Sequence, residues 1–190
     1  MITEDIYKNF SCPTWKALPE IDLYMDQVLS LIDKYLSAFT LPEEEIITSS
    51  MINNYVKQRL VPPPAKKRYD KTHIAFFMMI CVLKRVLSIS AVSLLLSELQ
   101  KSMTPEAIYT EFCRELESAV RNTASGKAIT PSEGTSPCSA MRSAVISFAN
   151  IASAEAVIRA LAPKEPEEQP EAKEKKKEKG KKNDGKEQSE

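Results

Sequence analysis

The sequence predicts an all-α fold, for three reasons. Apolar residues at positions 21–39 recur at spacings of three and four, which is the period of an amphipathic helix. Ten consecutive apolar residues at 74–83 are far fewer than the roughly twenty needed to cross a bilayer, and they suit a helix that is buried on every side. Thr104, Pro105 and Glu106 form a strong helix start, with a hydroxyl cap, a proline at the first position and an acid in the first turn.

The chain divides into four predicted segments. Residues 1–20 form an extended arm that holds the single tryptophan, Trp15, against the domain. Residues 21–100 form a helical domain, and residues 101–162 form a helical extension. Residues 163–190 contain nine Lys, nine acidic residues and no large apolar residue, so we expect a disordered tail.

A short helix with two different faces is predicted at about 48–60. At about 100° per residue, one half carries Met51, Ile52, Tyr55, Val56 and Leu60. The other half carries Ser50, Asn53, Asn54, Lys57 and Gln58, with no carboxylate among them. Amide and cationic groups without acids suit hydrogen bonds to base edges and phosphates. We therefore expect this helix to bind DNA through Asn53, Asn54, Lys57 and Gln58.

A proline-rich, basic loop follows at about 62–71. Its three prolines, at 62–64, end the helix, because proline lacks an N–H and the residue before it avoids the α region. We expect a stiff, extended run that carries the next basic residues outward as a wing, against a phosphate backbone. The expected DNA contacts of this wing are Lys66, Lys67, Arg68, Tyr69 and Lys71. The alternative is a basic loop that is simply solvated.

Four more helices are predicted after this loop. The apolar run at 74–83 is the central core helix. The next helix, at 90–99, begins with Ser90 as its N-cap and buries Val92, Leu95, Leu96 and Leu99. The helix opened by Thr104 places Ile108, Tyr109, Phe112, Cys113, Leu116 and Val120 on one side. The last, at 139–161, carries Met141, Val145, Phe148, Ile151 and Ile158 among many alanines, so we expect it to close the core or to form a dimer.

Charge is distributed unevenly, although the formal net charge of the chain is zero. Residues 51–90 contain eight Lys and Arg against one acid, a net charge of +7. Residues 1–50 contain three Lys against nine acids, a net charge of −6. The basic centre suits a polyanion, while the alternative is that the two regions neutralise each other within the fold.

The residue types that catalysis requires are scarce. His73 is the single histidine, which leaves no histidine cluster for a metal and no base to pair with a nucleophile, and we expect it to be a surface or capping residue. None of the four glycines lies in a phosphate-binding frame. Cys12, Cys81, Cys113 and Cys138 are widely spaced, as is typical of reduced structural cysteines. We therefore expect no enzyme, no metal and no cofactor, in a cytoplasmic protein without a secretory signal.

Distinctive strings run through the first half of the chain. They are Met51-Ile52-Asn53-Asn54-Tyr55-Val56-Lys57, Lys67-Arg68-Tyr69, His73-Ile74, Leu83-Lys84 and Leu87-Ser88-Ile89. They resemble a bacterial family of unknown function, DUF1836, and Leu23-Tyr24-Met25-Asp26-Gln27-Val28 after Trp15 resembles the opening motif of that family. The resemblance covers about residues 15–100, and it implies a family without implying a mechanism.

A second set of residues has the order of a recognition helix, a wing and two further helices. It comprises Ile52, Tyr55, Leu60-Val61-Pro62, Arg68-Tyr69, Ile74, Ile80 and Leu83-Lys84. In this order the stretch is more distantly similar to the DNA-binding domain of MerR-type regulators. The similarity implies DNA contacts at Asn53, Lys57, Lys67, Arg68 and Tyr69.

We therefore predict an all-α, winged helix-turn-helix-like (MerR-like) domain with a C-terminal helical extension and a disordered tail. The expected function is that of a transcriptional regulator, which binds double-stranded DNA as a homodimer and does not involve a membrane. The alternative is a non-enzymatic adaptor that binds other proteins through the acidic helix at 21–39.

Overall fold

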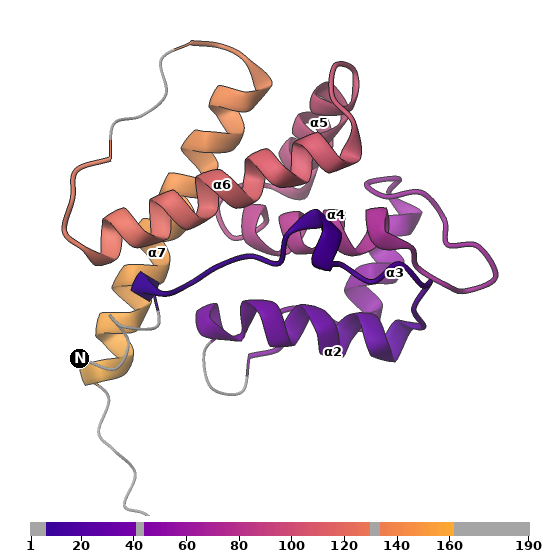
Figure 1. Cartoon of the computed structure of the whole chain (residues 1–190), viewed down its shortest axis with the longest axis horizontal. Coiled ribbons are helices and arrows are strands. Elements are labelled where there is room, and N and C mark those ends of the chain that lie inside the picture. The colour runs from indigo at the N-terminus through magenta and orange to yellow at the C-terminus, as the bar shows by residue number, and fades with distance from the viewer. Residues whose placement is uncertain (1–6, 41–43, 130–133, 162–190) are drawn as a thin grey trace, which may run out of the picture. The chain divides into compact units, whose positions relative to one another are not determined.

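A computed structural model describes residues 7–40, 44–129 and 134–161, and the described residues up to Ala160 form one compact unit. The described residues form helices and no β-strand, so the all-α prediction is confirmed for this part of the chain. In chain order (Figure 1) the helices are η1 (Trp15–Ala17), α2 (Met25–Leu36), η2 (Ser37–Phe39), α3 (Ser49–Lys57), α4 (Lys71–Leu83), α5 (Ile89–Gln100), α6 (Pro105–Ala124) and α7 (Pro137–Leu161), where η marks a 3-10 helix. The tail predicted at 163–190 lies outside the described residues.

The α4 helix is the centre of this fold. Every residue from His73 to Leu83 is buried, as predicted for the apolar run at 74–83. Helix α4 lies between α2 and α6 (Figure 1) and packs against both. A helix that is apolar on all sides has no face for water, so its neighbours must enclose it.

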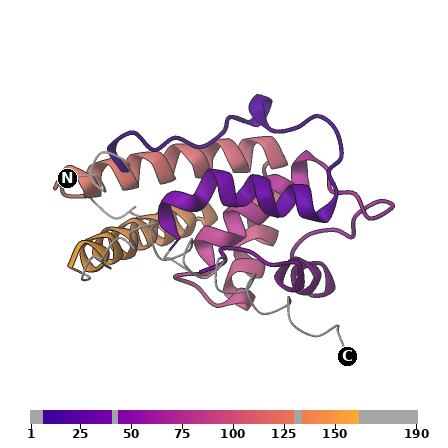
Figure 2. The same ribbon diagram turned by 90° about the horizontal axis from the view of Figure 1, so that it is seen from below.

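The N-terminal arm runs along α6 (Figure 2). The Tyr109 hydroxyl donates a hydrogen bond to the Pro13 carbonyl at 2.9 Å, and the Cys12 backbone N–H donates one to the Glu117 carboxylate at 2.8 Å. The ring of Trp15 lies 6.0 Å from that of Tyr109. The arm and its tryptophan therefore belong to the folded unit.

Helix α2 begins later than the sequence pattern predicts. The prediction placed Leu23 inside a helix at 21–39, but Leu23 forms an antiparallel bridge with Tyr69, and the helix begins at Met25. The bridge forms in place of a first helical turn because it satisfies the backbone N–H and C=O of both residues. The end of the predicted helix is also tighter than expected, since its last turn, η2, is a 3-10 helix.

The predicted N-cap is wrong for α5 and correct for α6. The N-cap of α5 is Ser88 and not Ser90, because the Ser88 side chain accepts a hydrogen bond from the Ala91 N–H at 3.2 Å. Ser90 lies in the first turn of the helix. Helix α6 begins at Pro105 with Thr104 as its N-cap, as predicted. Its buried residues include the predicted Ile108, Tyr109, Phe112, Cys113, Leu116 and Val120.

Helix α7 packs through its alanines and one aromatic ring. Phe148 meets Phe39 edge-on, with ring centroids 5.1 Å apart. The Arg85 guanidinium donates to both oxygens of Glu155 at 2.6 Å. Met141, Val145, Phe148, Ala144, Ala149, Ala152 and Ala156 are buried. Ile151 and Ile158 are exposed, so part of the apolar surface of this helix faces solvent.

By length and composition alone, α7 could also cross a membrane. This is weak evidence, because the core helices of soluble proteins meet the same criterion, and 33% of the most apolar window of α7 is buried against the rest of the fold.

Candidate nucleic-acid interface

The orientation of α3 is fixed by its apolar face and by its start. Ile52 and Tyr55 are buried, and burial raises the pKa of Tyr55 to about 12. The Thr48 side chain caps the helix by accepting a hydrogen bond from the Met51 N–H at 3.1 Å. Lys84, at the end of α4, donates a hydrogen bond to the Ile46 carbonyl at 2.8 Å and so secures the segment before the helix. The polar face of α3 is therefore held toward solvent.

The four predicted contacts of this helix lie on that polar face. Asn53, Asn54, Lys57 and Gln58 are all exposed. Within the described part of the chain, no side-chain hydrogen bond or ion pair engages any of them, so their donors and acceptors are open to a ligand.

The end of α3 has an unusual residue at a position that favours glycine. The Leu60 N–H donates to the Tyr55 carbonyl at 2.9 Å, and the Arg59 N–H donates to the Val56 carbonyl at 3.0 Å. These two bonds form a Schellman motif, in which the residue after the C-cap adopts a positive φ. That residue is Arg59, with φ = 61°.

The basic loop turns back on itself, which corrects the prediction of an extended run. Ala65 and Arg68 form an antiparallel bridge, and the Arg68 N–H donates to the Ala65 carbonyl at 2.9 Å. Between them Lys66 and Lys67 have φ values of 50° and 62°. Positive φ at both central residues is the condition for a type I′ turn, which matches the twist of paired strands. Residues 65–68 are called the hairpin turn below.

Positive φ in the described part of the chain is confined, apart from two glycines, to Arg59, Lys66 and Lys67. The left-handed conformation costs an L-residue roughly 1–2 kcal/mol, and glycine, asparagine and aspartate usually occupy such positions. Here all three carry a cation. Residues kept in an unfavourable conformation cluster at functional sites.

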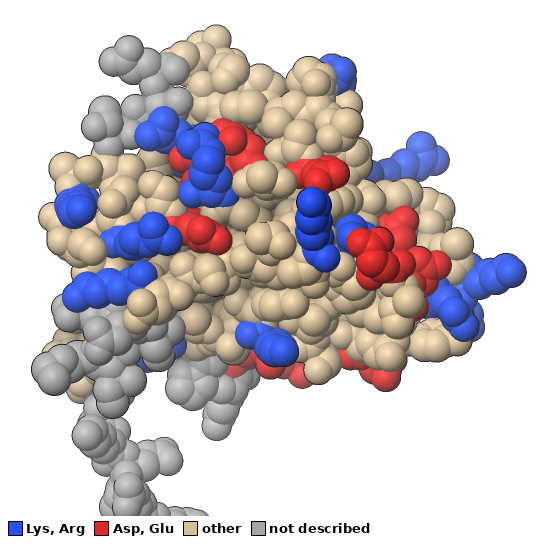
Figure 3. Space-filling view, in the orientation of Figure 1, with Lys and Arg blue, Asp and Glu red and all other residues tan. Residues whose placement is uncertain are grey.

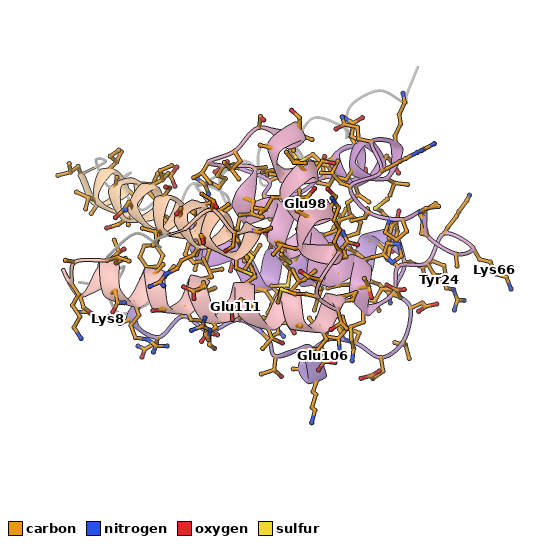
Figure 4. All side chains as sticks on the ribbon, turned by 90° about the horizontal axis from the view of Figure 1, so that it is seen from above. Lys8, Tyr24, Lys66, Glu98, Glu106 and Glu111 are labelled. Carbon is orange, nitrogen blue, oxygen red and sulfur yellow. The ribbon has the colours of Figure 1, made fainter. Side chains whose placement is uncertain are left out.

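Tyr24 attaches the hairpin turn to the segment before α2. Leu23 and Tyr69 exchange two backbone hydrogen bonds, of 2.9 and 2.8 Å. The Arg68 guanidinium donates to the Tyr24 hydroxyl at 2.8 Å and also lies 4.8 Å from the centre of that ring. Figure 4 shows Tyr24 beside the turn, with Lys66 projecting beyond it. This contact is a hydrogen bond and not an ion pair, because Tyr24 offers a hydroxyl and not a carboxylate.

Tyr69 lies in the core and not on the surface of the wing. It is 4% exposed, and its ring packs edge-on against those of His73 and Phe77. Burial raises the pKa of its hydroxyl. Tyr69 was predicted to contact DNA, but its ring is enclosed by the fold. Its position suits a residue that supports the hairpin turn.

His73 is buried, so the expectation of a surface residue is wrong, while the expectation of a capping residue is confirmed. Its Nε2–H donates to the Pro62 carbonyl at 3.0 Å, and its Nδ1 lies 2.7 Å from the Asp70 carboxylate. Burial of Asp70 opposes its ionisation, but the hydrogen bonds and the attraction from His73 outweigh this and lower the pKa of Asp70. The pair ties the proline segment to the start of α4.

Not every cation of the basic centre is open to a ligand. Lys71 forms an ion pair with Glu20 and lies 5.6 Å from the centre of the Trp15 ring. Arg85 pairs with Glu155. The exposed cations of α3 and the loop after it are Lys57, Arg59, Lys66, Lys67 and Arg68. Figure 3 shows Lys and Arg side chains at the right-hand edge, where the hairpin turn projects, with acidic side chains beside them.

Two residues of this surface were not among the predicted contacts. Arg59 was not predicted because the sequence contains no glycine to mark the end of the helix at that point. Tyr24 was not predicted because a tyrosine at helical spacing is usually a core residue, whereas here it is 49% exposed. A glycine or asparagine at position 59 would have marked the end of the helix, and the sequence has an arginine there.

The comparisons with known proteins give one match. The model of a family described as a domain of unknown function, DUF1836, matches residues 13–112. No curated protein and no solved structure matches the chain. Among the described residues there is also no group of three or more His, Cys, Asp or Glu that could hold a metal ion.

Proposed function

Because the chain belongs to the DUF1836 family, whose description assigns no function, we propose its function from geometry alone: it binds double-stranded DNA as a transcriptional regulator. Helix α3 enters the major groove as a recognition helix, and the hairpin turn is a short wing that contacts the phosphate backbone. We propose that these two elements form the winged, MerR-like arrangement that the sequence predicts. Figure 1 supports it, because α3 and the loop after it lie at the same end of the folded unit.

The observation that carries this proposal is the conformation of Arg59, Lys66 and Lys67. Each occupies a left-handed position at which glycine would cost less. A fold that needed the turn alone would gain nothing from three cations there. A polyanionic ligand gives these charges a use, because each phosphate they neutralise releases counterions.

The remaining predicted residues take roles that follow from their surroundings. Asn53, Asn54, Lys57 and Gln58 are exposed on α3 and face the groove. Lys66, Lys67 and Arg68 contact phosphates. Tyr69, which is buried, and Lys71, which is paired with Glu20, position the wing instead of contacting DNA.

A salt titration tests the proposal. The logarithm of the association constant should fall linearly with the logarithm of the salt concentration, with a slope of about −0.9 for each phosphate contacted. The double variant Lys67→Ala and Arg68→Ala should make this slope shallower by roughly one to two units for all sequences alike.

A matched control removes two charges elsewhere. Lys16 and Lys127 are exposed, and they lie outside the surface formed by α3 and the hairpin turn. The variant Lys16→Ala and Lys127→Ala changes the net charge equally but should leave the slope unchanged. Equal effects of the two double variants, or binding to DNA that salt does not weaken, would refute the proposed interface.

The regulator is further proposed to act as a homodimer. Val157 and Ile158 on α7 are more than half exposed, and these side chains would be buried between two copies. Dimers place two recognition helices on half-sites about one DNA turn apart. Sedimentation that finds a monomer at micromolar concentration would remove this part of the proposal.

The alternative function, a protein–protein adaptor, is favoured by one feature of α2. Asp33 on this helix and Glu44 and Glu45 after it line an open hollow beside the start of α3, which suits a basic peptide. Retention of the purified protein on heparin separates the two functions. DNA binding predicts strong retention that salt abolishes, and an acidic adaptor surface predicts none.

A further inference from the structure

The exposed face of α3 is rich in amide side chains, and amides distinguish between the bases of DNA. Its exposed residues are Ser49, Ser50, Asn53, Asn54 and Lys57, followed by the C-cap Gln58. Two asparagines stand at its middle and a glutamine at its end. The helix contains no arginine and no acid.

These side chains match one base better than the others. In the major groove adenine presents the N7 acceptor beside the N6 donor, and an asparagine or glutamine amide pairs with both. Guanine presents two acceptors and is usually bound by arginine or lysine, while the cytosine N4 donor requires an acceptor such as aspartate or glutamate. Lys57, in the last turn of α3, is a single lysine beside three amide side chains, so the face as a whole favours adenine.

The two asparagines are also hard to explain as structural residues. Asparagine costs roughly 0.5–0.7 kcal/mol relative to alanine inside a helix, and α3 has nine residues. Both side chains are exposed, and neither has a hydrogen-bond partner in the described part of the chain. Asn53 and Asn54 therefore weaken a short helix without any compensating contact within it.

The hairpin turn has a bias in the same direction. A·T-rich segments have a narrow minor groove with enhanced negative potential, which attracts lysine and arginine. Lys66 and Lys67 are adjacent at the tip of the turn, and Figure 4 shows Lys66 projecting outward. A helix in the major groove places a neighbouring turn at the adjacent backbone and minor groove.

From these features we infer that the protein prefers A·T-rich half-sites, and that Asn53 and Asn54 bind adenine in the major groove. This inference rests on the proposed DNA binding. It adds the class of sequence and the two residues that select it.

The test uses the full-length protein and two kinds of duplex. Bound sequences are first recovered from a pool of random 30-base-pair duplexes and their base composition is determined. The adenines of the most enriched duplex are then replaced by 7-deazaadenine, which keeps base pairing and the minor groove but lacks the N7 acceptor. We expect A·T enrichment, followed by a loss of affinity of roughly 5- to 150-fold for each adenine contact, which corresponds to 1–3 kcal/mol.

Variants assign the effect to residues. The double variant Asn53→Ala with Asn54→Ala should bind the normal and the 7-deazaadenine duplexes with similar affinity, and each single variant should lose only part of the discrimination. Alanine should strengthen the helix, so folding is not at risk. Asn150, exposed on α7, gives the matched control: Asn150→Ala should discriminate as strongly as the wild type.

Each other outcome is decisive. If no duplex binds in a salt-dependent manner, the proposed function fails and the inference fails with it. If duplexes bind with the expected salt dependence but the recovered pool is unbiased or rich in G·C, DNA binding stands and the inference is overturned. A·T enrichment that 7-deazaadenine does not weaken also overturns it, because adenine N7 would then not be contacted.

Discussion

Two neighbouring segments of the chain obey opposite rules. In α4 every residue from His73 to Leu83 is buried, and each residue type suits its surroundings. In the segment 57–68 the side chains are mostly exposed, and three cations occupy backbone positions that favour glycine. Sequences that fold well are locally consistent with their structure, and exceptions are expected at functional sites. The residues of α4 are those that the fold requires, whereas the contrast at segment 57–68 is what the proposed DNA binding rests on.

The largest expected effect is a loss of stability when a residue of α4 is truncated. Phe77 is fully buried in α4 and its ring contacts Tyr69. Phe77→Ala should lower the free energy of unfolding by roughly 3–5 kcal/mol, because it removes apolar contacts and leaves a cavity. Urea denaturation measures the loss. Leu94→Ala, at a position 62% exposed, should change stability by no more than about 0.5 kcal/mol, and a similar cost at both positions would erase the contrast.

The start of α4, which follows the segment 57–68, should contribute less to stability at low pH. Asp70 caps α4 by accepting a hydrogen bond from the His73 N–H at 3.0 Å, and Asp70→Ala should cost about 1 kcal/mol at pH 7. The pKa of Asp70 is lowered by folding, so its carboxylate stabilises the fold at any pH above the ordinary pKa of 3.8. This contribution is lost as pH falls through the lower, folded-state pKa. Thermal unfolding should therefore show the two proteins converging below about pH 4, and a constant difference down to pH 2 would contradict the assignment.

A smaller effect should separate stability from binding. Lys66→Gly with Lys67→Gly relieves roughly 1–2 kcal/mol of backbone strain per residue and gives back about 0.5–1 kcal/mol through unfolded-state entropy. The double variant should be as stable as the wild type or slightly more stable, while its affinity for DNA falls. Lys57→Gly, inside a helix, should instead lose about 1 kcal/mol of stability. Destabilisation of the turn variant in urea would show that the two lysines support the fold.

The smallest effect concerns a cation that the fold neutralises. Glu20 is exposed and pairs with Lys71 at the base of the wing. The Glu20 side chain is 79% exposed, although that of Lys71 is only 14% exposed. Because water screens the carboxylate, the pair should contribute about 1 kcal/mol or less, and Glu20→Gln should lower the melting temperature only slightly. DNA affinity at low salt should rise a few-fold at most, because repulsion between the carboxylate and phosphates is removed. A drop in affinity would mean that the pair holds the wing in place.

Much of the fold could be predicted because it depends on local patterns. The apolar run at 74–83 specified a buried helix, since no solvated arrangement exists for ten apolar residues in a soluble domain. Thr104 and Pro105 specified the start of α6 through capping chemistry. The two faces of α3 followed from its period, and Asn53 and Lys57 are exposed as that period requires.

Other features could not be predicted because they depend on contacts between distant residues. The bridge between Leu23 and Tyr69 moved the start of α2 and fixed the base of the wing. The same bridge helped to enclose Tyr69, which had been expected on the surface. The hairpin turn has no glycine or asparagine at its tip, so the rules of turn chemistry predict an extended run in its place.

The sequence by itself determined the helical class of the protein, its central helix and the amide-rich, acid-free face of α3, because these depend on the order of apolar and polar residues along the chain. The tertiary structure alone decided which cations remain open. Glu20 and Glu155 reach Lys71 and Arg85 from positions far away in the sequence, whereas Arg59, Lys66 and Lys67 are held outward at positive φ. Charge along a sequence is additive, but its availability to a ligand depends on which opposite charges the fold brings within a few ångströms.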